Sequence, residues 1–393
     1  MNVRSSLFAW LALALTTACG AQVLDVGDTG QQSPGGDGAA SGTKLPEGQV
    51  DPTWFPNTAC TAVGPTATLI VEADENQEIR GLAPDGDRIY FESHDMFAQS
   101  ALGRLMVHPI GGPAGTKHPS PVPVQNVRSL AGVFDRKVVY VQTTHLGDGS
   151  KTDPRVEELI VLDLDTGART VLPNPTGTTY VSAVDVTPSG VSWLSRAWDA
   201  TFPESISHWT PGAAAPLTTI QNHSFTTTDA KEVFYTRWDE LSPGNIQIRF
   251  EAVPIAGGTP RVLRTMAYDR KFFYGIVAVD DTEVYFTQQS LIDGSTIDVG
   301  DLRAIKKDGT AERVLTSGQK FGVASFRIDP DYLMWTDADS QRTVVRVRRT
   351  GGALERIVPG AANRSVGALA VDRCNIYWAV SNPPAIYARS RLP

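Results

Sequence analysis

The chain has 393 residues, with 35 Lys and Arg against 43 Asp and Glu, which gives a formal net charge of −8 at pH 7. No cluster of basic residues stands out from this acidic background, so the composition argues against nucleic acid and against direct binding to anionic lipid headgroups. The frequent glycines and prolines, 35 and 26 of them, favour a chain rich in turns.

Residues 1–19 have the features of an export signal. A basic residue precedes an apolar run over residues 7–15, which is too short to span a bilayer, and small residues lead to Cys19. This pattern resembles a bacterial lipoprotein signal, which implies cleavage before Cys19 and lipidation there. Thr16 stands where that pattern usually has Leu, so an ordinary secretory signal is the alternative.

Residues 20–58 are rich in Gly and Ser and contain few large apolar side chains. Such a segment cannot bury enough surface to offset the entropy of ordering, so we expect a disordered tether. The folded domain is then expected over residues 59–393.

A short motif, Asp-x-x-x-apolar-x-aromatic, recurs along this domain at intervals of 42 to 52 residues. Thr187 replaces the Asp in one copy, and Val141 replaces the aromatic in another. The seven copies, each given by its first and last positions, are Asp85/Phe91, Asp135/Val141, Thr187/Trp193, Asp229/Tyr235, Asp280/Phe286, Asp329/Trp335 and Asp372/Trp378.

One period reads as four short strands separated by turns, as in the copy that begins near Val323. The Asp is predicted to accept backbone N–H groups two residues on and so to start the hairpin between strands one and two. The aromatic is predicted to fill the gap between neighbouring sheets. Four-stranded units repeated around a circle make a β-propeller.

The sequence therefore predicts an all-β fold, a seven-bladed propeller of four-stranded antiparallel blades, with six blades as the alternative if the irregular second and third copies form one region. The last repeat lacks a fourth strand, and the segment 66–72 is a strand without a repeat. We expect this N-terminal strand to complete the last blade and close the ring.

Cys60 and Cys374 lie at the two ends of the folded part. A disulfide between them would fasten the closed ring, and an exported protein permits one. Two buried free thiols are the alternative.

The segments Met334-Trp335-Thr336-Asp337 and Ile376-Tyr377-Trp378-Ala379 resemble the YWTD propeller repeat, and residues 82–91 resemble the TolB-type repeat. The pattern also resembles exported lipoproteins of soil deltaproteobacteria. The resemblance implies the fold and not an activity, because relatives include receptor ectodomains, envelope scaffolds and enzymes. YWTD rings usually have six blades, so a count of seven departs from that family.

In a propeller, the second-to-third and fourth-to-first loops emerge on one face, and binding residues concentrate on such loops. These loops are acidic, with an aromatic sector, which suits an envelope protein or a carbohydrate as partner. The alternative is that the aromatics only pack the loops onto the blades. The predicted ligand-binding residues are Trp198, Trp238, Asp239, Tyr268, Arg270, Tyr274 and Asp337.

Linear motifs of catalysis and metal binding are absent from the sequence, so we name no catalytic residues, no metal ligands and no cofactor. Residues 147–153 offer oxygen ligands for Ca²⁺ but lack the spacing of a calcium loop. His94, His145 and His223 are predicted to reach the same face, where three imidazoles could hold a metal or move a proton. Unrelated surface histidines are the commoner case.

We therefore expect a non-catalytic binding or scaffold module, anchored through its N-terminal lipid on the periplasmic or outer-surface side of the bacterial envelope, or else secreted. The alternative is a propeller hydrolase or lyase that acts on an envelope or extracellular polymer. The sequence leaves open the identity of the partner and which membrane is involved.

Overall fold

The computed structural model describes residues 60–96, 103–112, 120–122, 124, 126–145, 155–174, 180–187, 190–196, 204–211, 213–220, 223–229, 231–242, 245–268, 271–292, 296–321, 326–337, 343–358 and 365–391. The predicted signal, Cys19 and the predicted tether lie outside these residues. Within the described ranges, no helix has both the length and the apolarity needed to cross a membrane.

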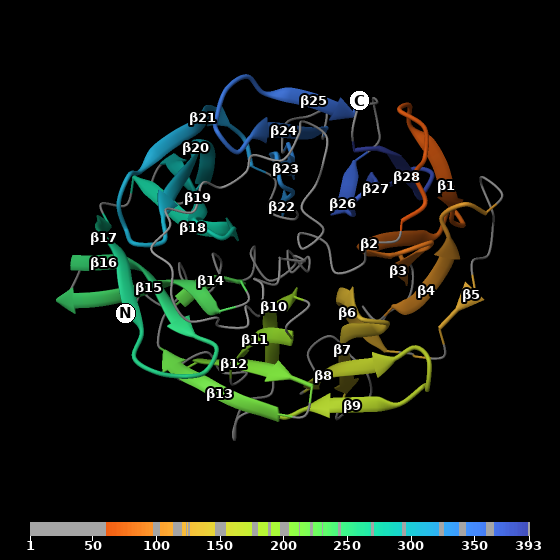
Figure 1. Ribbon diagram of the computed structural model, residues 1–393, viewed down its shortest axis with the longest axis horizontal. Coiled ribbons are helices and arrows are strands. Elements are labelled where there is room, and N and C mark those ends of the chain that lie inside the picture. The colour runs from red at the N-terminus through yellow and green to blue at the C-terminus, as the bar shows by residue number, and fades with distance from the viewer. Residues whose placement is uncertain are drawn as a thin grey trace, which may run out of the picture.

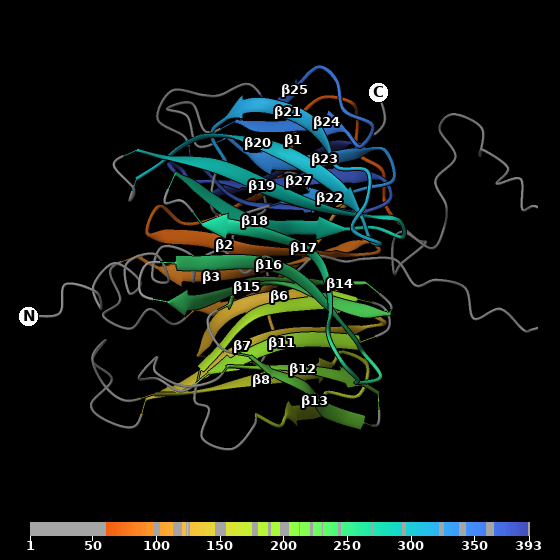
Figure 2. The ribbon, with the colours of Figure 1, turned by 90° about the vertical axis from the view of Figure 1, so that its left-hand side faces the viewer.

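The described residues form a seven-bladed β-propeller, in which seven four-stranded antiparallel sheets surround a common axis (Figure 1). This confirms the predicted fold and the count of seven over six. In every blade the first strand lies nearest the axis and the fourth forms the outer wall. Seen edge-on, the ring is a stack of twisted sheets with loops on both faces (Figure 2).

The first three blades follow one another along the chain. They consist of β2 (Gln77–Asp85), β3 (Arg88–Asp95), β4 (Arg104–Pro109) and β5 (Ser120–Pro121); β6 (Val127–Phe134), β7 (Lys137–His145), β8 (Arg155–Asp163) and β9 (Arg169–Leu172); and β10 (Tyr180–Thr187), β11 (Gly190–Arg196), β12 (Glu204–Thr210) and β13 (Ala213–Ile220).

Blades 4 to 6 continue in the same order and include the longest strands. They consist of β14 (His223–Thr228), β15 (Glu232–Ser242), β16 (Asn245–Pro254) and β17 (Arg261–Tyr268); β18 (Phe272–Val279), β19 (Glu283–Ile292), β20 (Thr296–Lys306) and β21 (Arg313–Gln319); and β22 (Arg327–Ile328), β23 (Tyr332–Thr336), β24 (Val344–Arg348) and β25 (Glu355–Val358).

Blade 7 joins the two ends of the folded chain. It consists of β26 (Val366–Val371), β27 (Asn375–Val380), β28 (Ala385–Ser390) and, as its outer strand, β1 (Thr68–Glu72), which pairs antiparallel with β28. Cys60 and Cys374 form a disulfide with Cα atoms 6.0 Å apart. The predicted ring closure and the predicted disulfide are both confirmed.

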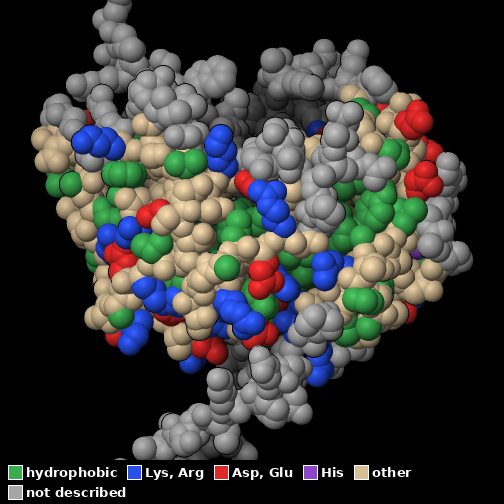
Figure 3. Space-filling model, turned by 90° about the horizontal axis from the view of Figure 1, so that it is seen from above, with side chains coloured by type: hydrophobic (Ala, Val, Ile, Leu, Met, Phe, Trp, Pro, Cys, Tyr) green, Lys and Arg blue, Asp and Glu red, His purple; other side chains and the backbone are tan. Residues whose placement is uncertain are grey.

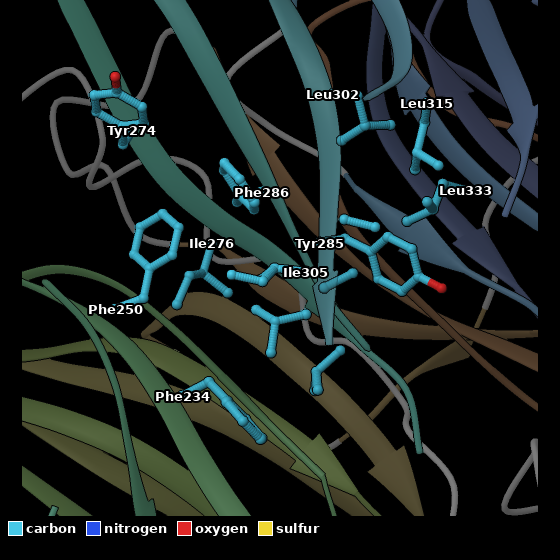
Figure 4. Close-up of a cluster of buried hydrophobic side chains, with 14 of the residues drawn as sticks. Phe234, Phe250, Tyr274, Ile276, Tyr285, Phe286, Leu302, Ile305, Leu315 and Leu333 are labelled. Carbon is cyan, nitrogen blue, oxygen red and sulfur yellow. The ribbon is translucent and has the colours of Figure 1, made fainter. Parts of the chain in front are cut away.

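The last residue of each motif copy lies on a second strand and is buried, as predicted. Exposure is 2% or less at all seven positions, Phe91, Val141, Trp193, Tyr235, Phe286, Trp335 and Trp378. Between blades 4 and 5, Phe286 of β19 meets Phe250 of β16 edge to face, with ring centroids 4.9 Å apart (Figure 4). Burial of such rings between sheets dominates the cohesion of the ring.

Four of the six motif aspartates start their hairpins in the predicted way. In Asp280, Oδ1 accepts the backbone N–H of Thr282 at 2.7 Å and of Glu283 at 2.8 Å. The same pair of bonds, to the residues two and three places on, recurs at Asp229, Asp329 and Asp372. Each carboxylate thus fixes the tight turn that reverses the chain between the first and second strands.

The second oxygen of several motif aspartates binds a cation of the next blade, which the sequence did not predict. Each of these cations comes directly after a third strand. The pairs are Asp229 with Lys307, Asp280 with Arg349 and Asp329 with Arg391. The aspartates therefore fasten neighbouring blades together as well as starting their own hairpins.

The predicted turns between third and fourth strands hold glycines where the backbone needs them. Gly309, between β20 and β21, has φ of +83°, and a Cβ there would lie 2.3 Å from the carbonyl oxygen of Leu263 in blade 4. Only glycine permits both this conformation and this approach.

The outer wall of the ring carries Lys and Arg side chains beside Asp and Glu side chains, with apolar side chains between them (Figure 3). Val171, Val262 and Val314 are about half exposed on the fourth strands β9, β17 and β21. The leucine that follows each of them is buried. This alternation is expected because successive side chains of a strand point to opposite faces.

Candidate functional site

The described members of the predicted binding set all lie toward one face of the ring, the face of the second-to-third-strand connections. Trp238 and Asp239 lie near the end of β15, Tyr268 ends β17, Tyr274 is near the start of β18, and Asp337 follows β23. Trp198 and Arg270 lie outside the described residues. The five placed residues come from blades 4 to 6, so the structure brings part of the predicted set into one sector.

The aromatic members of this sector pack against each other. The Trp238 ring meets Tyr268 edge to face, with centroids 5.1 Å apart, and lies 6.1 Å from the ring of Phe273 in the next blade. Trp238 is only 8% exposed and Tyr274 only 9%. The indole seals the junction between blades 4 and 5, so little of its face is open to a ligand.

Asp239 is neutralised by two arginines. Its Oδ1 accepts from Nε of Arg237 at 2.9 Å, and its Oδ2 accepts from Nε of Arg249 at 2.9 Å. The bond to Asp239 is the largest cause that raises the pKa of Arg249. Asp239 is therefore part of a cluster of paired charges and does not offer a free carboxylate to a ligand.

A buried carboxylate supports this cluster from below. Glu251 is 2% exposed and accepts the Tyr235 hydroxyl at 2.8 Å, while Nη1 of Arg249 lies 3.4 Å from its Oε1. Burial and this bond raise the pKa of Tyr235, so its hydroxyl stays protonated and keeps donating. Arg249 is therefore held between two carboxylates, Asp239 and Glu251.

Asp337 is also buried, with 7% exposure, where the second-to-third connection of blade 6 begins. Its backbone N–H donates to the carbonyl of Thr343 at 2.8 Å, and it forms an isolated bridge with Phe321. This position fastens the base of the connection.

Sequence reasoning missed Arg237, Arg249 and Glu251 of this sector, and it also missed the exposed Leu241. Leu241 is 60% exposed on β15, which has 11 residues and forms with β16 a hairpin whose end reaches the face of the second-to-third connections (Figure 2). The available signal was a large apolar residue between Glu240 and Ser242 at a hairpin tip, where polar residues are the rule.

The described histidines are internal. His94 is 2% exposed and contacts Glu92, whose Oε2 accepts the backbone N–H of Leu130 in blade 2 at 2.9 Å. His208 is 5% exposed and bonds Ser192 at 2.8 Å, and burial lowers its pKa to about 4. The side chains of His145 and His223 lie outside the description, as does the loop 147–153.

Among the residues that the structure describes, no three His, Cys, Asp or Glu side chains lie together in a way that would hold a metal ion. Asp239 already faces two arginines, and Glu251 faces an arginine and a tyrosine hydroxyl. What this sector offers chemically is contact, through Leu241 and the paired charges around it.

No protein family model and no curated protein matches the sequence. Among solved structures, the chain is similar to the β-propeller domain of the trilobed protease of Pyrococcus furiosus, with 8% identity, 80% of this chain and 95% of that chain covered, and a TM-score of 0.58. It is similar to the tricorn protease at 12% identity, with 84% of this chain but only 34% of that chain covered, and a TM-score of 0.55.

TolB from Acinetobacter baumannii, whose type of repeat the sequence resembles, also matches, at 11% identity over 80% of each chain with a TM-score of 0.42. The resemblance to the YWTD repeat stays a prediction. At such low identities the two likenesses with the higher TM-scores show the fold alone, a β-propeller.

Proposed function

We propose that the protein is an exported, lipid-anchored and non-catalytic binding or scaffold module of the bacterial envelope. The disulfide between Cys60 and Cys374 supports export, because disulfides persist in oxidising compartments. Ion pairs between blades and a ring closed by β1 support a rigid platform that presents loops to a partner.

The observation that carries the proposal is Leu241, which is exposed near the end of the β15–β16 hairpin, in the strand that also holds the packed Trp238. An exposed apolar side chain on a rigid strand, two residues from an aspartate that is paired with arginines, is typical of the centre of a protein–protein contact. A carbohydrate would need an open aromatic face for stacking, and Trp238 has little of its face free. The packing therefore favours a protein partner over a carbohydrate.

A photo-crosslinking amino acid at position 241 of the full chain, used in intact cells, tests this surface. We expect a discrete adduct with one envelope protein, and we expect Leu241→Glu to abolish co-purification of that protein. The matched control is position 262, because Val262 is similarly exposed, at 49%, but lies on the outer wall. Equal adducts at both positions, or none at 241, would contradict the proposal.

The competing prediction is a hydrolase or lyase that acts on an envelope or extracellular polymer. Release of soluble fragments from such a polymer by the purified protein would establish it and overturn the non-catalytic proposal.

A further inference from the structure

The innermost strands of the ring contain one layer in which two charges stand opposite each other. The layer is the position two residues before the first residue of each motif. Around the ring these positions are Ala83, Val133, Asp185, Thr227, Ala278, Arg327 and Ala370. Five are small or uncharged, and the two charged ones belong to β10 of blade 3 and β22 of blade 6, which face each other across the axis (Figure 1).

The carboxylate of Asp185 has hydrogen-bond partners at the junction between blades 3 and 4. It is 4% exposed, and its Oδ2 accepts the backbone N–H of Thr228 at 2.6 Å and the Thr227 hydroxyl at 3.1 Å. These bonds join β10 to β14 and compensate the burial of the carboxylate.

Arg327 is buried and, among the described residues, has fewer polar partners than Asp185. It is 6% exposed, and its hydrogen bond within the described part of the chain runs from Nη1 to the carbonyl of the preceding residue, Phe326, at 2.7 Å. No carboxylate of the described residues lies within ion-pair distance of it. A guanidinium has five N–H donors, so its donors outnumber its acceptors here.

The charge of Arg327 persists at neutral pH. Burial lowers the pKa of the guanidinium to about 10, and the negative charge of Asp185 opposes that effect from the other side of the ring. Arg327 lies on β22, the innermost strand of blade 6, so this charge is close to the axis of the ring. A buried cation of this kind is costly unless an anion compensates it.

We propose that Arg327 is the recognition residue of a small oxyanion site near the axis of the ring, which takes a carboxylate or a phosphate group. The planar fork of a guanidinium matches two oxygens of either group, and the buried setting strengthens each bond. The opposing Asp185 limits the site to one anionic group, since its carboxylate repels a second. This site is independent of the Leu241 surface.

Thermal unfolding of the purified protein at constant ionic strength tests the site, with inorganic phosphate and succinate as probes and chloride as the reference. A ligand that binds only the folded state raises the unfolding midpoint with RT ln(1 + [L]/Kd). We expect the wild type to show a rise with at least one probe, and Arg327→Met to lose that rise. The wild-type probe with the larger rise identifies the class of anion.

The same variant separates a binding role from a structural one. Phosphate stabilises proteins generally, because it is excluded from their surfaces. The site is therefore measured by the rise in the unfolding midpoint of the wild type minus the rise in that of Arg327→Met. In chloride alone we expect Arg327→Met to be at least as stable as the wild type, because an uncompensated cation has gone. Equal rises in both proteins, no rise with either probe, or a variant strongly destabilised in chloride would overturn the proposal.

Discussion

The motif aspartates show how one residue type acquires different electrostatics from its neighbours. Burial raises the pKa of Asp280, but Arg349, Tyr285 and two backbone N–H groups outweigh it and hold the pKa below its usual value. Burial prevails at Asp329 despite Arg391, and it raises the pKa of Asp372 to about 6. The balance between burial and these polar partners decides the sign.

The pair of Arg349 and Asp280 is predicted to be worth several kcal/mol. Arg349 also donates to Tyr285 at 3.0 Å and to the carbonyl of Pro330 at 2.8 Å, so Arg349→Met leaves a buried carboxylate without its cation. We expect the free energy of unfolding in urea at pH 7 to fall by about 3–5 kcal/mol.

The matched control for that variant is an exposed pair, Arg80 with Glu78, whose side chains are 45% and 43% exposed. Arg80→Met is expected to cost at most about 1 kcal/mol, because solvent screens the pair. Similar losses in the two variants would show that the contact between blades adds nothing beyond a surface ion pair.

Asp372 is predicted to make stability depend on pH. Its folded pKa of about 6 lies above the ordinary 3.8, so the folded state binds the proton more tightly. The resulting stabilisation is present below about pH 4 and is lost as the pH rises through 6, a change of about 3 kcal/mol. Asn at this position can still accept the N–H groups of Cys374 and Asn375.

Urea titrations of the wild type and of Asp372→Asn between pH 4 and pH 7 measure this effect. We expect the stability of the wild type relative to the variant to fall by about 2.5 kcal/mol over that range. Parallel curves would mean that the carboxyl group is ionised throughout.

At the scale of elements, β1 is the piece that turns an open array of blades into a ring. Besides its ladder with β28, the N-terminal segment bonds Asn375, which accepts from the backbone of Val63 at 3.0 Å and donates to the carbonyl of Thr61 at 2.8 Å. The disulfide spans 314 residues of sequence at the same place. The solved propeller of the trilobed protease is described as having an open velcro topology, whereas this ring is closed by a strand.

Cys374→Ser is therefore expected to lower stability by up to about 5 kcal/mol, because the cross-link closes a very long loop in the unfolded chain. Hydrogen exchange should show where the loss falls. We expect the largest increase in exchange in β1 and β28, and a smaller increase in β18 and β19, which reports only the lower global stability. A uniform increase in all blades would contradict a local role for the closure.

At the scale of the whole molecule, the blades form a continuous series of contacts rather than separate sheets. The largest apolar cluster runs from Phe234 in blade 4 to Val347 in blade 6, and the cation contacts link each of these blades to the next. A closed ring of this kind resists local opening, which suits a platform that holds loops in fixed positions.

Attachment of this platform to a membrane rests on Cys19. We predict that Cys19→Ala moves the protein from the membrane fraction to the soluble fraction of fractionated cells, with the disulfide still formed. Because one lipid chain binds membranes only marginally, the wild type should carry more than one acyl chain, as mass spectrometry would show. A membrane-bound variant would contradict the lipid anchor.

The repeat in the sequence determined the fold of this protein, its seven blades, the hairpin role of Asp229, Asp280, Asp329 and Asp372, and the closure by β1 with the Cys60–Cys374 disulfide. The blades and hairpins could be predicted because their pattern is complete within one period. The closure could be predicted because one spare strand and one pair of cysteines lie at the two ends of the folded part. The same logic assigned Trp238 and Asp239 to this face, but it placed them on a loop, whereas they lie within β15 because the β15–β16 hairpin is longer than expected.

Only the tertiary structure decided how those side chains are used. Trp238 packs against Phe273 of the next blade and Asp239 lies between two arginines, so the exposed residue there is Leu241. The cation contacts join residues 62 to 78 positions apart, and Asp185 of β10 accepts the backbone N–H of Thr228 in the next blade. Such contacts follow from the rotation of each blade relative to the next, which no pattern within a single period encodes.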